Sequence, residues 1–292
     1  MAEQSVIEHP RRKFPDYAYH REKIWWLASY PKSGNTWLRM FLTAYARGGF
    51  VNINMAEGLG TSDLNAYFYQ AVSPRPIERL RPEEILLIRP AALLHMTSFY
   101  NNPKAPFFLK THSMYKYELG TIPHPLTHGA IYLVRDPRDI AVSYAKHCGK
   151  PLDLIIAAMG NAQHALHDEQ SPIFQLLGTW SMHVQSWLDA TLIKRLVIRY
   201  EDLLEQPRES FFGILKFIQY QLNQPVFDRA LAATTFDALR AQEDRIGFKE
   251  RRCGDRFFNQ GKTGAWKDTL SKAQSDRIES DHREVMQTMG YL

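Results

Sequence analysis

The sequence predicts an α/β fold, in which a central parallel β-sheet carries helices on both faces. Two observations support this fold class. Short apolar segments typical of buried strands alternate along the chain with segments typical of helices. The most distinctive polar motifs follow the apolar segments directly, and the carboxyl ends of parallel strands are where such folds bind their ligands. We therefore expect one α/β domain with a ligand site at that edge of the sheet.

The individual elements follow from composition and from the positions of proline. Four apolar segments predict strands over residues 24–30, 107–110, 130–134 and 195–200. Spacing of apolar residues predicts helices over residues 37–45, 82–88, 137–147, 172–190 and 211–220. Pro137 suits the first position of its helix, because proline lacks the N–H group that a helix leaves unpaired there.

Length and composition exclude several classes of protein. The chain has 292 residues, of which 45% are hydrophobic and 23% charged, so a collagen, a coiled-coil rod and a largely disordered chain are excluded. Its two cysteines exclude a disulfide framework and an all-cysteine zinc site. The formal net charge of +5 suits an anionic ligand as well as it suits nucleic acid.

The first residues are polar and charged, without the apolar core of a signal peptide, and no apolar run is long enough for a membrane span. We expect a cytoplasmic protein. Residues 1–22 are expected to form a lead-in and residues 23–292 a single domain. The sequence leaves the oligomeric state open.

Residues 29–37, SYPKSGNTW, predict an anion site. A loop of small residues between a strand and a helix turns backbone N–H groups toward one point, and the helix N-terminus adds partial positive charge there. Lys32 adds a full charge, and the hydroxyls of Ser33 and Thr36 add donors. The loop is no Walker A motif, because Lys32 precedes Gly34 instead of following the last glycine. The plainer interpretation is a strand-to-helix turn with a hydroxyl cap.

Two further strand ends carry residues suited to chemistry on an anion. His112 ends the second strand, and a histidine can take a proton from a hydroxyl near neutral pH. Alternation along the strand places Lys110 on the same face as His112. Arg135 ends the third strand and offers a forked donor to phosphate, and Ser143 in the next helix offers a hydroxyl. A strand-capping histidine and an arginine paired with a neighbouring aspartate are the plainer interpretations.

The segments around these residues resemble, in order, the motifs of the cytosolic-type sulfotransferases, which use 3′-phosphoadenosine 5′-phosphosulfate (PAPS). SYPKSGNTW is similar to the 5′-phosphosulfate loop TYPKSGTTW, FLKTH to the segment with the catalytic histidine, and YLVRDPRDIAVSY to the 3′-phosphate motif. Farther along, IRYEDLLEQP resembles the YEDL segment, TTF the adenine-contacting TSF, and GKTGAWK the final GxxGDWK. These segments span about 240 residues, so the resemblance covers nearly the whole chain.

The resemblance implies a sulfotransferase with a P-loop-like phosphosulfate-binding loop, and it implies roles for single residues. Lys32 would stabilise the leaving 5′-phosphate, His112 would take the proton of the acceptor, and Lys110 would help to hold the sulfuryl group. The residues implied to bind PAPS are Lys32, Ser33, Gly34, Asn35, Thr36, Trp37, Arg135, Ser143, Tyr200, Thr234, Phe236 and Gly261. Arg135 and Ser143 would hold the 3′-phosphate. The adenine pocket would be formed by Trp37, Tyr200, Thr234 and Phe236.

The last motif departs from the family pattern. The family has a basic residue two positions before the first glycine of this motif, where this chain has Asn259. Ala265 also replaces the usual acid, although Gly261 and Gly264 remain. The sequence does not choose among the basic residues that could replace the missing charge, which are Arg251, Arg252, Arg256 and Lys262.

The acceptor of the sulfuryl group is not determined by these motifs. It is expected to contact the segments 50–105, 147–175 and 240–258, whose aromatic residues favour a ring-bearing or partly apolar molecule and whose basic residues favour a carbohydrate acid. A hydroxyl, or an amine, of a small molecule, glycolipid, carbohydrate or peptide would fit. Neither a metal site nor nucleic-acid binding is expected.

Two other functions are compatible with a loop of this kind. A P-loop-like nucleotide kinase would use a similar loop and would require magnesium and ATP. A protein that binds PAPS without catalysis would keep the loop, but the intact Lys32 and His112 argue against it.

Overall fold

The structure, a computed structural model, describes residues 24–54, 61–100, 106–168, 171–253, 256–259 and 261–292. The expected lead-in, residues 1–22, lies outside this part of the chain. The strands are β1 (Ile24–Ser29), β2 (Thr61–Ser62), β3 (Phe107–Thr111), β4 (Thr127–Val134), β5 (Ala165–Asp168), β6 (Ser171–Leu176) and β7 (Arg195–Arg199). They form a five-stranded sheet of order β2-β3-β1-β4-β7 and a separate β5-β6 pair.

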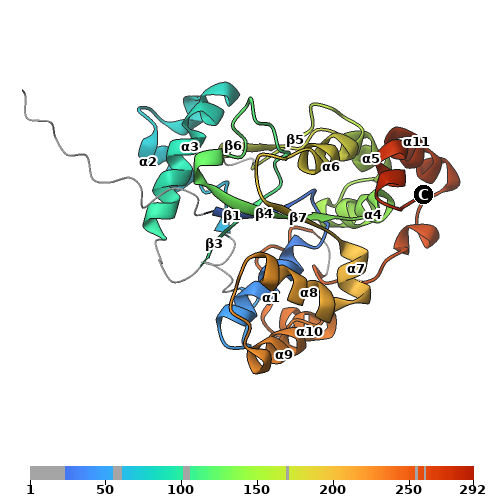
Figure 1. The fold of residues 1–292 in the computed structure, drawn as a ribbon. Helices are drawn as coiled ribbons and strands as arrows, with labels where there is room; N and C mark the ends of the chain where they lie inside the picture. The colour runs from blue at the N-terminus through green and yellow to red at the C-terminus, as the bar shows by residue number, and fades with distance from the viewer. Residues whose placement is uncertain (1–23, 55–60, 101–105, 169–170, 254–255, 260) are drawn as a thin grey trace, which may run out of the picture.

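The helices lie on both faces of the larger sheet (Figure 1). They are α1 (Asn35–Ala46), α2 (Ala66–Val72), α3 (Pro82–Phe99), α4 (Pro137–Cys148), α5 (Leu152–Met159), α6 (Trp180–Leu188), α7 (Tyr200–Glu205), α8 (Pro207–Phe217), α9 (Gln224–Ala233), α10 (Phe236–Ile246) and α11 (Lys272–Thr288). Every neighbouring pair in the larger sheet is parallel. The predicted parallel sheet with helices on both faces is therefore confirmed.

Alternation along β1 explains how one strand serves two cores. Trp26 and Ala28 face a large cluster that includes side chains of α3, α4, α6 and α11. Trp25 and Leu27 face a second cluster, built with α1, α8 and α9. All four side chains are 5% exposed or less, so β1 is buried on both faces as a central parallel strand should be. This burial holds the loop that follows β1 in a defined place.

The predicted helix over residues 172–190 is wrong. Ser171–Leu176 is instead strand β6, paired antiparallel with β5, and helix α6 begins only at Trp180. In β6 the buried Ile173 and Gln175 alternate with half-buried neighbours, which is the period of a strand. Gly178 then adopts φ +64°, and the side chain of Thr179 accepts a hydrogen bond from the N–H of Met182 as the cap of α6.

Other predicted elements are confirmed with shifted ends. Helix α3 continues past residue 88 to Phe99, because the apolar residues persist beyond Pro90. Helix α1 begins at Asn35, and the last strand of the sheet ends at Arg199, so that Tyr200 opens α7. The sequence did not predict helices α2, α5, α7, α9, α10 and α11, or the short strand β2.

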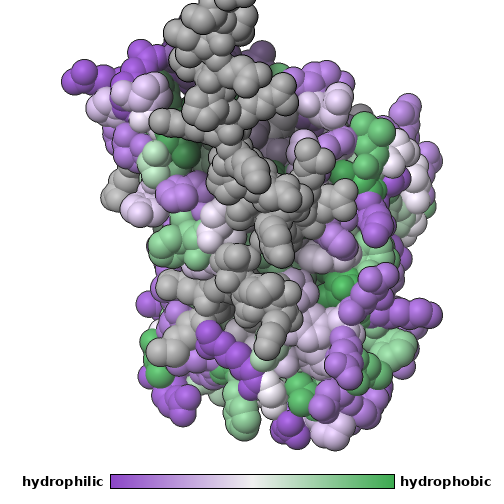
Figure 2. Space-filling model, turned by 60° about the vertical axis from the view of Figure 1, so that its left-hand side comes forward, coloured by the Kyte–Doolittle hydropathy of each residue, from purple (hydrophilic) through white to green (hydrophobic). Residues whose placement is uncertain are grey.

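Within the described residues, no helix is both long and apolar enough to cross a membrane. On the face shown in Figure 2, hydrophobic residues form separate patches among hydrophilic ones.

Candidate active site

A cleft of about 2090 Å³ opens where the strands of the sheet end. The segments after four strands contribute to its wall, with Lys32 after β1, His112 after β3, Arg135 after β4 and Tyr200 after β7. Residues far apart in the sequence meet here because the carboxyl ends of parallel strands lie along one edge. The structure thus brings the strand-end residues singled out from the sequence to one cavity.

The loop between β1 and α1 forms a tight backbone cradle. Lys32 adopts φ +68° and Gly34 φ +97°, the left-handed region in which a Cβ atom is unfavourable. The Asn35 side chain ties the start of α1 to β1 by donating to the Leu27 carbonyl at 2.8 Å. Among the residues that the structure describes, the buried Ser33 hydroxyl has no hydrogen-bond partner, although Ser33 is not one of the residues that line the cleft. A buried donor without a partner suits a loop that binds an anion.

Positive charge is concentrated beside this cradle. Burial, together with the charges of the neighbouring Lys110 and Arg135, lowers the pKa of Lys32 to about 8. The pKa of Lys110 is also lowered to about 8, chiefly by burial and then by Arg39. The Lys32 ammonium lies 4.1 Å from the centre of the Phe257 ring. The charges of Lys110 and Arg135 repel that of Lys32, and an anion bound among them would reduce the repulsion. Such an arrangement is typical of a phosphate or sulfate site.

His112 is held in one orientation by β1. Its Nδ1 atom lies 2.7 Å from the Ser29 carbonyl oxygen, which can only accept, so Nδ1 carries the proton. Burial holds the pKa of His112 well below its ordinary value, and Lys110 adds to the shift. The ring is therefore neutral near pH 7, and its Nε2 atom carries a lone pair. A neutral imidazole with Nε2 unprotonated can accept a proton.

Arg135 lies along the open side of the loop. Its guanidinium donates to the Lys32 carbonyl at 3.1 Å and to the Lys262 carbonyl at 3.2 Å, and it lies 4.3 Å from the centre of the Tyr200 ring. The Nε atom of Arg135 is buried and has no hydrogen-bond partner among the described residues. Arg135 thus joins the β1 loop to the segment around Gly261, and Ser143 lines the same cleft from α4.

The residues expected around adenine divide into two groups. Trp37, Tyr200 and Phe236 line the cleft, and Gly261 lies so close to Phe236 that a Cβ atom would come within 2.3 Å of its ring. Thr234 is not among the lining residues, because its hydroxyl donates to the Ala230 carbonyl inside α9. The Thr234 carbonyl instead accepts the Trp37 indole N–H at 2.8 Å, and so orients that ring.

An ion pair within the cleft was not predicted from the sequence. Arg39 of α1 donates to both carboxylate oxygens of Glu250, at 2.7 and 2.8 Å, and also to the Thr36 hydroxyl at 3.2 Å. Because the Thr36 oxygen accepts this bond, its own hydrogen remains available to another acceptor. The spacing of Thr36 and Arg39, three residues apart in the first turn of α1, was the only local signal. Nothing in the sequence connected either residue to Glu250.

The aromatic residues of segment 50–105 do not line the cleft. Phe68 and Tyr69 are buried in the core between α2 and α3, whereas Tyr67 and Phe99 are exposed to solvent. The residues of segment 50–105 that do line the cleft are Thr61, Ser62, Leu64 and Asn65, so contact of this segment with the acceptor stays a prediction. Among the residues that the structure describes, no group of three histidine, cysteine or acidic side chains could hold a metal ion.

The sulfotransferase domain family matches residues 22–290, nearly all of the chain and every loop of the cleft. The chain belongs to the sulfotransferase family. Sulfotransferase 1B1 of Canis lupus familiaris is 23% identical to it over 287 residues, which cover 89% of this chain and 82% of the relative. Sulfotransferase 1A1 of Bos taurus is 24% identical over 275 residues, with the same coverage.

The sulfotransferase also shares its fold with solved structures. Mouse sulfotransferase SULT7A1 complexed with PAP superposes with a TM-score of 0.59 and 18% sequence identity, over 91% of this chain and 85% of that one. Retinol dehydratase in a complex with retinol and PAP gives a TM-score of 0.60 and 19% identity, over 91% and 82% of the two chains. This enzyme therefore has the sulfotransferase fold, and its reaction is sulfuryl transfer.

In this sulfotransferase, Asn259 lines the cleft where the family pattern has a basic residue. Arg251, Arg252 and Arg256 line the cleft as well, whereas Lys262 does not. Arg256 forms a 3.0 Å ion pair with Asp244.

Proposed function

We propose that this protein transfers the sulfuryl group of PAPS to an acceptor hydroxyl or amine, with His112 as the general base. The observation that carries the proposal is the meeting of the β1 loop, its cations and a neutral histidine in one cleft. Among the described residues, the buried Ser33 hydroxyl and Arg135 Nε have no hydrogen-bond partner, which supports the fit of a phosphorylated ligand. The charges of Lys110 and Arg135, which add to the lowering of the Lys32 pKa by burial, also support it, since a bound anion would reduce their repulsion of Lys32.

Each end of the donor has candidate residues. The 5′-phosphosulfate would be held by the cradle, through Lys32, Ser33, Gly34, Asn35 and Thr36. Arg135 and Ser143 would hold the 3′-phosphate, and Trp37, Tyr200 and Phe236 would enclose the adenine. Thr234 would act behind Trp37 instead of touching the ligand. Arg251, Arg252 and Arg256 are the candidates to supply the charge that Asn259 lacks.

When bound, PAPS supplies a sulfuryl group carried on an oxygen of its 5′-phosphate. His112 Nε2 would take the proton of the acceptor as the acceptor oxygen attacks sulfur. Lys32 would offset the charge that builds on the departing 5′-phosphate, and Lys110 would hold the sulfuryl oxygens. Because charge builds on the departing oxygen as its bond to sulfur breaks, a fixed cation there lowers the barrier more than it stabilises the bound substrate.

The donor is tested by thermal unfolding with PAP, the desulfated product, and with ATP. PAP should raise the melting temperature by mass action, and ATP should raise it far less because ATP lacks the 3′-phosphate. Equal shifts at equal concentration would remove the support for a PAPS enzyme and favour a kinase.

His112 is tested with a His112→Asn variant. Turnover of PAPS should fall by roughly 10²- to 10⁴-fold, the usual contribution of a positioned base. Affinity for PAP should stay near that of the parent protein, because the base faces the acceptor. A folded variant with near-normal turnover on an alcohol acceptor would rule out the proposed role.

The charge of the cleft favours an acidic acceptor. Of the residues that the structure describes, eleven lysines and arginines and only two carboxylates, Asp139 and Glu250, line it. PAPS carries roughly four negative charges, fewer than the positive charges that line the cleft. Lining cations outside the contacts proposed for the donor include Lys146, Lys150 and Arg240. An acceptor with a carboxylate, sulfate or phosphate group would complete this site.

A matched series of phenols tests the acceptor. 4-Hydroxyphenylacetate, its neutral amide and tyramine carry the same nucleophile with charges of −1, 0 and +1. The ratio kcat/KM should be highest for the acid, and its advantage should shrink in high salt. Arg252→Gln should reduce that advantage, whereas Lys216→Gln, on an exposed residue outside the cleft, should not. Preference for the amide or for tyramine would contradict an acidic acceptor.

A further inference from the structure

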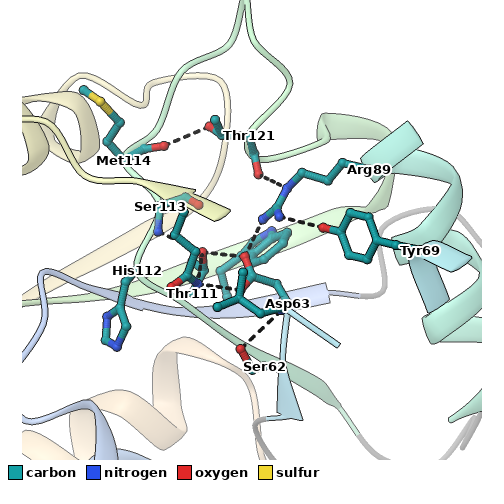
Figure 3. A network of polar contacts seen from close by, with 12 residues as sticks. Ser62, Asp63, Tyr69, Arg89, Thr111, His112, Ser113, Met114 and Thr121 are labelled. Carbon is teal, nitrogen blue, oxygen red and sulfur yellow. Dashed lines mark hydrogen bonds and ion pairs between the residues drawn. The ribbon is translucent and has the colours of Figure 1, made fainter. Parts of the chain in front are cut away.

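A buried ion pair lies directly behind the strand end that carries His112. Asp63, which follows β2, is fully buried and pairs with Arg89 of α3, which is 2% exposed (Figure 3). The N–H of Asp63 also donates to the Lys110 carbonyl at 3.1 Å, which fixes the acid beside β3. The pair thus lies between a core helix and the edge of the cleft.

The two charges are surrounded by hydrogen-bond partners. Arg89 donates to the Tyr69 hydroxyl and to the Thr121 carbonyl, each at 2.8 Å. Asp63 accepts from the Gln175 amide at 2.5 Å and from the Thr111 hydroxyl at 2.7 Å. Removing two charges from water costs several kcal/mol per ion, and apolar side chains often stabilise a core equally well. A contribution to stability alone therefore does not explain the ion pair of Asp63 and Arg89, and the neighbouring backbone that the pair anchors is the better explanation.

The network holds the backbone on both sides of His112. Asp63 is a carboxylate that only accepts, so the Thr111 hydroxyl must donate its hydrogen to it. The same oxygen then accepts the N–H of Ser113 at 3.0 Å. One hydroxyl thereby links the residue before His112 to the residue after it, and anchors both to a buried charge. Figure 3 shows the His112 ring pointing away from Arg89.

We propose that Asp63 and Arg89, acting through the Thr111 hydroxyl, are positioning residues that hold the His112 imidazole in its productive orientation. The proposal rests on the role proposed for His112. Without the anchor, the turn between Thr111 and Ser113 would rotate, and Nδ1 would lose its alignment with the Ser29 carbonyl. Misplacement of a reacting group by about 1 Å can lower the rate roughly 100-fold.

The test compares Thr111→Val, which removes the hydroxyl at nearly constant shape, with Thr111→Ser, which keeps it. Three quantities are measured: PAP affinity, kcat with PAPS, and the His112 imidazole signals in NMR as a function of pH. Thr111→Val should lower kcat roughly 10- to 100-fold and leave the Kd of PAP within about two-fold. It should also lower the pKa of His112 further, because the contact with the Ser29 carbonyl raises that pKa and would be lost. Thr111→Ser, which keeps the hydroxyl, should leave kcat, the Kd of PAP and the pKa of His112 near their parental values.

A control and a second variant keep the test decisive. Thr97→Val removes another buried threonine hydroxyl, bonded to the Leu94 carbonyl in α3, and should affect stability only. If Thr111→Val does not fold, Tyr69→Phe removes one partner of Arg89 and should shift the His112 signals in the same direction. A folded Thr111→Val protein with parental His112 signals would overturn the proposal. The NMR result does not depend on turnover, so it stands apart from failure of the PAPS assignment, which PAP binding tests.

Discussion

Replacing Gly34 by alanine tests whether the cradle is built as tightly as the structure indicates. Gly34 has φ +97°, where a residue with a Cβ atom is strained. An added Cβ atom would also lie 2.6 Å from Cδ2 of Tyr200. The ring cannot move aside easily, because it is 8% exposed and has the Arg135 guanidinium 4.3 Å from its centre.

The expected loss of stability has two parts. The left-handed backbone costs an alanine about 1–2 kcal/mol. The overlap with Tyr200 adds about 1–3 kcal/mol, as for other overpacked sites. Gly48→Ala is the matched control, because Gly48 has φ +72° and nothing lies within 4 Å of its Cβ position. Gly48→Ala should therefore lose only the free energy of unfolding that the left-handed backbone costs.

The assay is chemical denaturation of both variants, followed by calorimetry with PAP. Gly34→Ala should reduce the free energy of unfolding by about 1–3 kcal/mol more than Gly48→Ala does. It should also weaken PAP binding, because Tyr200 and the cradle are displaced together, whereas Gly48→Ala should bind normally. Equal effects of the two substitutions on stability and on PAP binding would refute the reasoning.

Three further predictions concern charge and one concerns the last glycine motif. The pKa of Lys32 is 10.5 in the unfolded chain and about 8 in the folded protein. Between these pH values the unfolded chain binds more protons, so the free energy of unfolding should rise with pH. Lys32→Met should reduce that rise when denaturation is measured as a function of pH. PAP should favour protonated Lys32, so calorimetry should detect proton uptake on binding above pH 8 and a falling affinity, and constant affinity would count against the site. Arg135→Ala should weaken PAP binding by about 2 kcal/mol, and an unchanged Kd would remove Arg135 from the 3′-phosphate. Gly261→Ala, whose Cβ would lie 2.3 Å from Phe236, should weaken PAP binding more than Gly264→Ala, which meets nothing within 4 Å; equal losses would contradict the close packing.

Prediction from the sequence succeeded where the signal was local. Four of the five strands of the larger sheet were found, because a strand buried on both faces is a continuous apolar run, as in β1 and β4. The anion loop was found because a strand, a small-residue turn and a helix are consecutive in the chain. Prediction failed for residues 172–190, where six apolar-rich residues form β6 and nine form α6. An apolar run this short does not separate strand from helix by periodicity alone.

The sequence alone determined the positions of Lys32, His112, Lys110 and Arg135 at one edge of a parallel sheet, because each lies at the end of a recognisable strand or just after it, and parallel topology aligns strand ends. Pairings between distant segments were decided only by tertiary structure. Arg39 meets Glu250 across 211 residues, and Gln175 meets Asp63 across 112, with no periodicity to relate them. The sequence also predicted Thr234 as a ligand contact, but its hydroxyl donates to the Ala230 carbonyl of α9. A side chain's partner depends on how layers pack, and packing is set by the shapes of all the elements together.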